Sequence, residues 1–322
     1  MIEDINNLND LKKIKENIDT EVTKYVVGWD HVLQSLLIGL FAGGHILLEG
    51  VPGTAKTYLA KIFSDCLSLS FRRIQSTPDL MPSDITGSHI FNTKNLEFDF
   101  IPGPIFANLV LVDEINRAPP KSQSALLECM QESQVTVDGK TSKLDEPFMI
   151  IATKNPIEFE GTFPLPVAQL DRFMSRLIMN YPPHKAWVEI LNNKNERGET
   201  VNIDPIVKPK ALISGRNLVR NVEVKKDALE FIVDLVSQTR IMNQISLGAS
   251  PTASVALLNA SKGYAAVVEG RDNVTVEDVK AIAFDVLNHR MIVKSDQYSS
   301  TSEEDTSDLS SIKTIINESI ES

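Results

Sequence analysis

The sequence predicts an α/β domain with a parallel sheet covered by helices on both faces, followed by a small all-α domain. Strands are expected near residues 45–49, 71–76, 109–113, 148–153 and 177–181, and helical patterns separate them. Such alternation is typical of a parallel sheet with two buried faces. After Tyr181-Pro182-Pro183 the apolar spacing is helical as far as about Lys294. The length of 322 residues also favours two domains.

Two further segments flank these domains. Apolar residues between Leu8 and Ile18 recur at helical spacing and predict an exposed helix ahead of the core. Residues 299–308 contain no apolar side chain, so a linker is expected there, and four isoleucines between Ile312 and Ile320 predict a short amphipathic helix after it. The predicted boundaries are 1–25 for the N-terminal helix, 26–184 for the α/β domain, 185–294 for the helical domain and 295–322 for the acidic, serine-rich end.

A glycine-containing loop with the sequence Gly-Val-Pro-Gly-Thr-Ala-Lys-Thr, residues 50–57, joins the first predicted strand to a helix. In such loops backbone N–H groups turn toward phosphate oxygens, a lysine reaches the β and γ oxygens, and a hydroxyl binds Mg²⁺. Lys56 and Thr57 fit the last two roles, and the helix adds its positive dipole end. The alternative is a glycine-containing turn with an exposed lysine. The predicted nucleotide contacts are Gly50, Pro52, Gly53, Thr54, Ala55, Lys56, Thr57 and Tyr58.

One position of this loop departs from the usual pattern. Ala55 stands directly before the lysine, where the motif ordinarily has its second glycine. We therefore expect a backbone conformation at Ala55 that an ordinary L-residue holds.

A pair of carboxylates, Asp113 and Glu114, follows the apolar run 109–112. The carboxyl ends of buried parallel strands are where open α/β sheets bind ligands. Asp113 is expected to hold Mg²⁺ through its water shell, and Glu114 to orient the attacking water, because phosphoryl transfer depends mainly on positioning and electrostatics. The alternatives are a solvated strand end or a charge at a helix N-terminus.

Composition excludes several other classes of protein. Seven acidic residues against one lysine in segment 295–322 account for more than half of the net charge of −11, and no basic stripe is present, so nucleic acid is an unlikely partner. The start Met-Ile-Glu-Asp and the lack of an eighteen-residue apolar run predict a soluble cytoplasmic protein without membrane insertion. Cys66 and Cys129 are expected to be free buried thiols, and the histidines show no zinc spacing.

Three stretches together resemble the MoxR family of AAA+ ATPases: the loop at residues 50–57, the run 112–132 that begins Val-Asp-Glu-Ile-Asn-Arg-Ala-Pro-Pro, and the run 152–173 that ends Ala-Gln-Leu-Asp-Arg-Phe. The resemblance extends from about Val26 to about Arg290 and is specific, because the motifs are long. It implies ATP and Mg²⁺ as ligands and ATP hydrolysis as the activity.

The resemblance also assigns residues outside the loop. Asn155 matches the first sensor, an amide that holds the γ-phosphate or the attacking water, although an Asn before Pro156 is also typical of a turn. Arg172 matches the arginine finger that reaches a neighbouring subunit's site, with Arg176 as the alternative if the segment is helical. Val27 and Gly28 match the segment that contacts the adenine.

The family implies a ring, expected to be a hexamer, that remodels or matures a client protein together with a partner carrying a von Willebrand factor A domain. Thr252 stands where the family usually has the arginine of its second sensor, and it carries no charge. This favours one alternative, a nucleotide-gated scaffold with little hydrolysis. The other alternative is a nucleic-acid translocase. Two predicted hairpins, turning at residues 92–95 and 138–139, either line the ring's pore, face a partner or are solvated loops.

Overall fold

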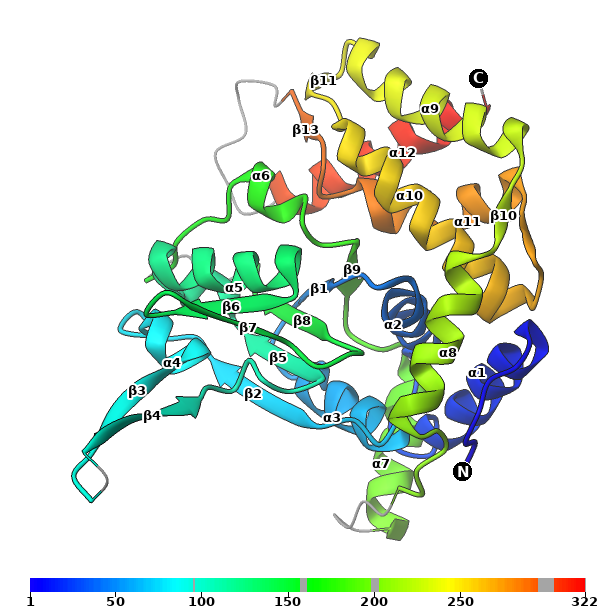
Figure 1. The fold of residues 1–322 in the computed structure, drawn as a ribbon. Helices are drawn as coiled ribbons and strands as arrows, with labels where there is room; N and C mark the ends of the chain where they lie inside the picture. The colour runs from blue at the N-terminus through cyan, green and yellow to red at the C-terminus, as the bar shows by residue number, and fades with distance from the viewer. Residues whose placement is uncertain (95, 157–160, 198–202, 295–303, 322) are drawn as a thin grey trace.

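The computed structural model describes residues 1–94, 96–156, 161–197, 203–294 and 304–321. Its centre is a five-stranded parallel sheet in the order β2-β5-β8-β1-β9 (Figure 1). The strands are β1 (Ile46–Gly50), β2 (Phe71–Gln75), β5 (Leu109–Asp113), β8 (Met149–Lys154) and β9 (Ser175–Met179). All five lie within two residues of the predicted runs. The strand β1 therefore lies between β8 and β9, with Ile46 opposite Ile151 and Ser175.

Helices cover both faces of the sheet, as predicted. On one face, alternate strand residues such as Leu48 and Leu111 belong to the core formed with α2 (Asp30–Ala42) and α3 (Lys56–Cys66). On the other face, Leu47 and Val112 pack with residues of α5 (Pro120–Glu132). This division follows from the two-residue period of a strand, which sends successive side chains to opposite faces.

Two hairpins interrupt the α/β alternation at the predicted places. The first follows the short helix α4 (Pro82–Thr86) and pairs β3 (Gly87–Asn92) with β4 (Glu97–Pro102), and it extends away from the body (Figure 1). The second pairs β6 (Gln134–Val137) with β7 (Lys140–Lys143) through Asp138 and Gly139, both at positive φ. An ion pair between His89 Nδ1 and Asp138 Oδ2, 2.9 Å apart, joins the two hairpins.

The N-terminal helix α1 (Leu8–Val22) is packed into the molecule, so the expectation of an exposed helix is wrong. Its residues Leu11, Ile14 and Ile18 have no solvent exposure. They contact α3 and the short π-helix η2 (Ala265–Glu269) of the C-terminal half. The helix is therefore part of the core and contacts elements from both the N-terminal and the C-terminal parts of the chain.

The second part of the chain is helical, as predicted, but it also contains two short ladders. Its helices are α7 (His184–Arg197), α8 (Pro209–Arg220), α9 (Lys226–Ile241), α10 (Pro251–Tyr264) and α11 (Val276–Leu287). The ladders pair β10 (Glu223–Val224) with β12 (Asn273–Val274), and β11 (Ile245–Leu247) with β13 (Ile292–Val293). The sequence predicts only the helices here, because strands of two or three residues are too short to show a detectable alternation of apolar and polar residues.

The C-terminal helix α12 (Glu304–Glu321) is longer than predicted. Of the expected linker, residues 299–303 lie outside the described part, whereas residues 304–308 are helical, so that part of the expectation is wrong. Ile312, Ile315 and Ile316 are buried against the helical part, where α12 contacts α9 and α11. Tertiary packing of this apolar face thus extends the helix into a polar sequence.

Two other expectations concern single residues and membrane spans. Cys66 and Cys129 are free and buried, as predicted, and burial raises the pKa of each thiol to about 12. Within the described ranges, no helix combines the length and apolar character needed to cross a bilayer.

Candidate active site

The loop after β1 is shaped by close backbone contacts. A side chain at Gly50 would meet the backbone oxygen of Met179 at 2.2 Å, so only glycine fits beside β9. Gly53 has φ +80°, a conformation that favours glycine. The ammonium of Lys56 donates to the carbonyl oxygens of Gly50 and Val51 at 2.7 and 2.9 Å, and partial burial lowers its pKa. The lysine therefore lies inside the loop, and the loop's own carbonyls are its partners.

Ala55 adopts a left-handed conformation, with φ +61° and ψ 24°. The expectation of an ordinary backbone at this position is therefore wrong. The physical reason is the geometry of the turn, because the chain reverses between Gly53 and the first turn of α3 just where Ala55 stands. For an alanine this conformation costs about 1–2 kcal/mol relative to the right-handed helical region.

The predicted magnesium ligands lie next to each other. The hydroxyl of Thr57, in the first turn of α3, donates to Asp113 Oδ2 at 3.3 Å. Asp113 ends β5, is buried, and also accepts a bond from Thr153 Oγ1 at 3.2 Å. A hydroxyl and a carboxylate are hard oxygen donors of the kind that Mg²⁺ prefers. The donor set at the ends of β5 and α3 therefore fits this ion.

Arg73 is an unexpected neighbour of the same carboxylate. Arg73 lies in the middle of β2, and its Nε donates to Asp113 Oδ2 at 2.5 Å. The arginine side chain is half exposed, whereas that of Asp113 is 8% exposed. The guanidinium thus supplies a positive charge at the position where a metal ion would neutralise Asp113.

Glu114 is oriented by groups from two strands and from the turn that follows it. It is the residue after β5, has φ +54°, and its backbone N–H donates to Thr153 Oγ1 of β8 at 2.9 Å. Its carboxylate accepts a bond from Gln75 Nε2 of β2 at 3.4 Å and lies 3.6 Å from Arg117 Nη1. These contacts therefore hold the Glu114 carboxylate at the carboxyl edge of the sheet, on the same edge as the loop at residues 50–57.

The remaining predicted contacts surround the same edge. Asn155 directly follows β8 and is buried. Gly28, with φ +87°, lies against the segment after β9, where a side chain on it would meet Ala186 Cβ at 3.3 Å. Val27 precedes it, and Tyr58 of α3 is partly exposed. Since β1 lies between β8 and β9, its neighbouring strand ends bring Asn155 and the Gly28 turn to the two sides of the loop.

Sequence reasoning missed Arg73, Gln75 and Thr153. All three lie on strands that were themselves predicted. Gln75 ends β2 and Thr153 is the penultimate residue of β8, whereas Arg73 lies in the middle of β2. For Gln75 and Thr153, a polar residue at the carboxyl end of a strand was the available signal, because this edge of the sheet is where ligands bind.

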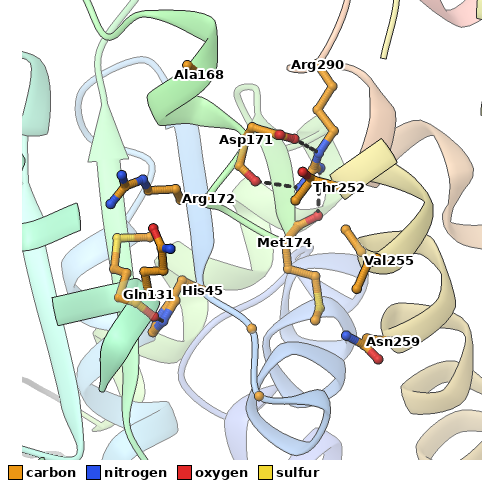
Figure 2. A pocket seen from close by; sticks show the side chains of 14 residues that line it. His45, Gln131, Ala168, Asp171, Arg172, Met174, Thr252, Val255, Asn259 and Arg290 are labelled. Carbon is orange, nitrogen blue, oxygen red and sulfur yellow. Dashed lines mark hydrogen bonds and ion pairs between the residues drawn. The ribbon is translucent and has the colours of Figure 1, made fainter. Parts of the chain in front are cut away.

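Arg172 lies at the opposite end of the sheet. It is exposed, it precedes β9, and its Nη1 donates to the carbonyl of Leu127 at 2.7 Å. It lines a pocket of about 490 Å³ together with Gly44 and His45, which precede β1 (Figure 2). The loop at residues 50–57 follows β1, and five strand residues span about 16 Å. The structure therefore does not bring Arg172 to the phosphate loop of its own chain.

Arg176 and Thr252 are also placed by the fold. Arg176 belongs to β9 and not to a helix, so the basis for the alternative finger is wrong; it is half-buried, with Nη1 3.8 Å from Glu49 Oε2. Thr252 is at the second position of α10 and lines the same pocket as Arg172. Thr252 thus lies beside Arg172, near the residues that precede β1 and not near the loop at residues 50–57.

A phosphate loop between β1 and α3, acidic residues at the end of β5 and a helical domain after the sheet define a P-loop ATPase of the AAA+ class. Residues 45–175 match the family model described as "ATPase family associated with various cellular activities (AAA)", and residues 237–312 match the AAA lid domain. The chain belongs to the MoxR family of these ATPases, because it is 40% identical to the Chaperone MoxR1 of Mycobacterium tuberculosis over 86% of this chain and 75% of the relative.

Two other proteins show the same extent of similarity. The protein YeaC of Bacillus subtilis is 43% identical over 84% of this chain and 85% of its own. A crystal structure of a candidate ATPase from Cytophaga hutchinsonii superposes with a TM-score of 0.85 at 38% identity, and it covers 96% of this chain and 95% of that one. The similarity thus includes both the sheet and the helical part.

Proposed function

We propose that this chain hydrolyses ATP with Mg²⁺. The observation that carries the proposal is the 3.3 Å contact between Thr57 Oγ1 and Asp113 Oδ2. Lys56 directly precedes Thr57 in the sequence, and Glu114 directly follows Asp113. These four residues come from α3 and from the end of β5, and they supply a cation, two oxygen donors and a carboxylate at one edge of the sheet. That set corresponds to the parts that phosphoryl transfer requires.

Each residue has a role that its contacts support. Lys56 exchanges the carbonyls of Gly50 and Val51 for phosphate oxygens. Thr57 and Asp113 hold Mg²⁺, which neutralises charge on the phosphates when it is bound. Glu114 orients the attacking water and accepts its proton, and Asn155 holds the water or the γ-phosphate from the next strand.

The exposed Arg172 supports an oligomer. In a ring, an arginine at the far end of one subunit's sheet completes the site at the loop end of the next subunit. We propose a hexamer of this kind, acting in the cytoplasm on a client protein, with a von Willebrand factor A domain protein as partner. The chaperone name of the Mycobacterium tuberculosis relative supports the action on a protein client.

The first test is the glutamate. Glu114→Gln keeps the shape of the side chain and removes its negative charge, so we expect ATP binding within about twofold of the parent and turnover lower by about a hundredfold or more. Steady-state phosphate release and ATP titration measure the two quantities. Lys56→Ala is the control that loses binding as well. A Glu114→Gln protein with turnover within a few-fold of the parent would contradict the assignment.

A second candidate function, a nucleotide-gated scaffold that binds ATP and hardly hydrolyses it, is favoured by the ion pair between Arg73 and Asp113. A guanidinium at this carboxylate competes with Mg²⁺. The same turnover assay distinguishes the two functions, because the scaffold binds Mg²⁺ and ATP without releasing phosphate above the rate of the Lys56→Ala protein.

A further inference from the structure

The backbone on both sides of Arg172 is held by the helical domain of the same chain. The contacts come from three consecutive residues that follow α11, and the middle one, His289, has its Nε2 3.1 Å from the carbonyl oxygen of Phe173. Asn288 Nδ2 donates to the carbonyl of Arg176 at 2.9 Å, and the guanidinium of Arg290 bonds the segment 171–174. The side chain of Arg290 is 2% exposed. A buried cation from the helical domain thus reaches the strand β9 and the turn before it.

The guanidinium of Arg290 is engaged along its whole fork. Nε donates to Asp171 Oδ1 at 2.7 Å, Nη2 donates to the carbonyls of Asp171 and Phe173 at 3.1 and 2.6 Å, and Nη1 donates to the carbonyl of Met174 at 3.1 Å. Asp171 Oδ2 accepts a further bond from the hydroxyl of Ser250, the residue before α10, at 2.9 Å. Among these partners, Asp171 and Phe173 stand directly before and directly after Arg172.

The side chain of Arg172 itself points away from this cluster. Figure 2 shows it extending from the turn to the side opposite Asp171 and Arg290, into the pocket. Its guanidinium donates to the carbonyl of Leu127, and the side chain is exposed. The helical domain therefore fixes the base of this arginine and leaves its guanidinium accessible.

We propose that Arg290, together with Asp171 and Ser250, is a positioning residue through which each subunit's helical domain sets the arginine finger that it presents to its neighbour. The inference rests on the proposed action of Arg172 across a subunit boundary. A planar guanidinium that makes several hydrogen bonds fixes the position of a backbone segment more narrowly than a single hydrogen bond does. A displacement of a catalytic group by 1 Å costs about a hundredfold in rate.

A purely structural role is the competing explanation, and the chain offers a matched control for it. Arg216 is also a buried arginine of the helical part, with Nε 2.8 Å from the carbonyl of Leu40 and Nη2 3.3 Å from that of Phe148. Its partners are the end of α2 and the residue before β8. It joins the helical part to the sheet domain without touching residues 171–174.

The experiment measures ATP hydrolysis in mixtures of full-length variants. Arg290→Lys keeps the charge and loses the fork, and Asp171→Asn is a milder change on the other partner. We expect each to lower kcat by about ten- to a hundredfold while the ATP affinity stays within about twofold. Mixed with Lys56→Ala, each recovers activity, since its own loop is intact. Mixed with Arg172→Ala, neither recovers, since both chains then lack a working finger.

The reference mixture of Lys56→Ala with Arg172→Ala tests the finger action of Arg172 separately from the positioning role of Arg290. If it shows no recovery, the proposed finger action is wrong. If it recovers but Arg290→Lys and Asp171→Asn fail to recover with Lys56→Ala, or recover with Arg172→Ala, the positioning role is wrong. Arg216→Lys is expected to lower the melting temperature without this pattern of recovery, and the same pattern from Arg216→Lys would overturn the proposal.

Discussion

Arg73 is the residue whose contact has the most direct consequence for the metal site. Its Nε lies 2.5 Å from Asp113 Oδ2, so Mg²⁺ bound by Asp113, as we propose, would compete with a guanidinium for this carboxylate. A charge-assisted bond is worth about 1.5–3 kcal/mol, and we therefore expect Arg73→Gln to lower the half-saturating Mg²⁺ concentration by about tenfold. Titration of ATP turnover with Mg²⁺ measures this. Arg72→Gln, on the opposite face of the same strand, is the control, and an unchanged or higher Mg²⁺ requirement for Arg73→Gln contradicts the competition.

Ala55 provides a second prediction at the scale of a residue. Glycine adopts φ +61° without the cost that alanine bears, although it also gains freedom in the unfolded chain. We expect Ala55→Gly to raise the free energy of unfolding by up to about 1 kcal/mol. Urea denaturation without nucleotide tests this. Ala125→Gly, inside α5, should lower the same free energy by about 1 kcal/mol, and a loss of stability at both positions would exclude strain at Ala55.

The residues of the site were predictable where a strand end determined their position. Asp113 and Thr57 meet because β5 and the loop after β1 end at one edge, and that edge follows from parallel strands alone. The contacts of Arg73 with Asp113 and of Gln75 with Glu114 were not predictable from spacing. They require β2 to lie next to β5, and no local sequence pattern determines that strand order. The bonds of Arg290 to residues 171–174 join segments more than a hundred residues apart, and no periodicity reports them.

Among the elements, the strands and hairpins were predictable and the packing of the terminal helices was not. Apolar runs and the Asp138-Gly139 turn determine local structure directly. The apolar stripe of α1 indicates a helix with one buried face, but it does not say what covers that face. The elements that cover it are η2 and α3, and the contact with η2 depends on where the helical domain packs against the rest of the chain.

The contact between α2 and α11 predicts a dependence of stability on pH. His31 Nε2 lies 2.7 Å from Asp285 Oδ2, and Ser35 of α2 bonds the same oxygen. The bond to Asp285 raises the pKa of His31 above its usual 6.5. The protonated form therefore stabilises the fold below about pH 6.5, and this contribution is lost as the pH rises through the raised pKa in the folded state.

His31→Gln should remove this pH dependence. The imidazole is 60% exposed, so the contribution is expected to be below about 1 kcal/mol. Unfolding free energies at pH 5.5 and pH 8 measure it, and the parent should lose more stability between the two than the His31→Gln protein does. His184→Gln, at the exposed start of α7, controls for the loss of an imidazole. Equal losses in parent and His31→Gln would exclude the contact as the source.

At the scale of the whole molecule, the position of Thr252 predicts which nucleotide an arginine at residue 252 would contact. Because Thr252 lines the pocket of Arg172, an arginine there is expected to reach a neighbour's nucleotide and not its own. Thr252→Arg should leave ATP affinity unchanged at protein concentrations too low for assembly, and tighten it by about tenfold once subunits associate. ATP titrations at the two concentrations make the comparison. Equal tightening in the dilute protein would mean that the residue acts within its own chain.

The position of α1 has a consequence for how the chain folds during synthesis. The backbone N–H of Ile2 bonds the carbonyl of Ile206, and the apolar face of α1 is covered by α3 and by η2, which is made about 250 residues later. At the usual rate of translation that interval is on the order of tens of seconds. The apolar stripe of α1 can therefore be covered early only in part, by α3, and the nascent protein depends on its last third to complete the burial of its first helix.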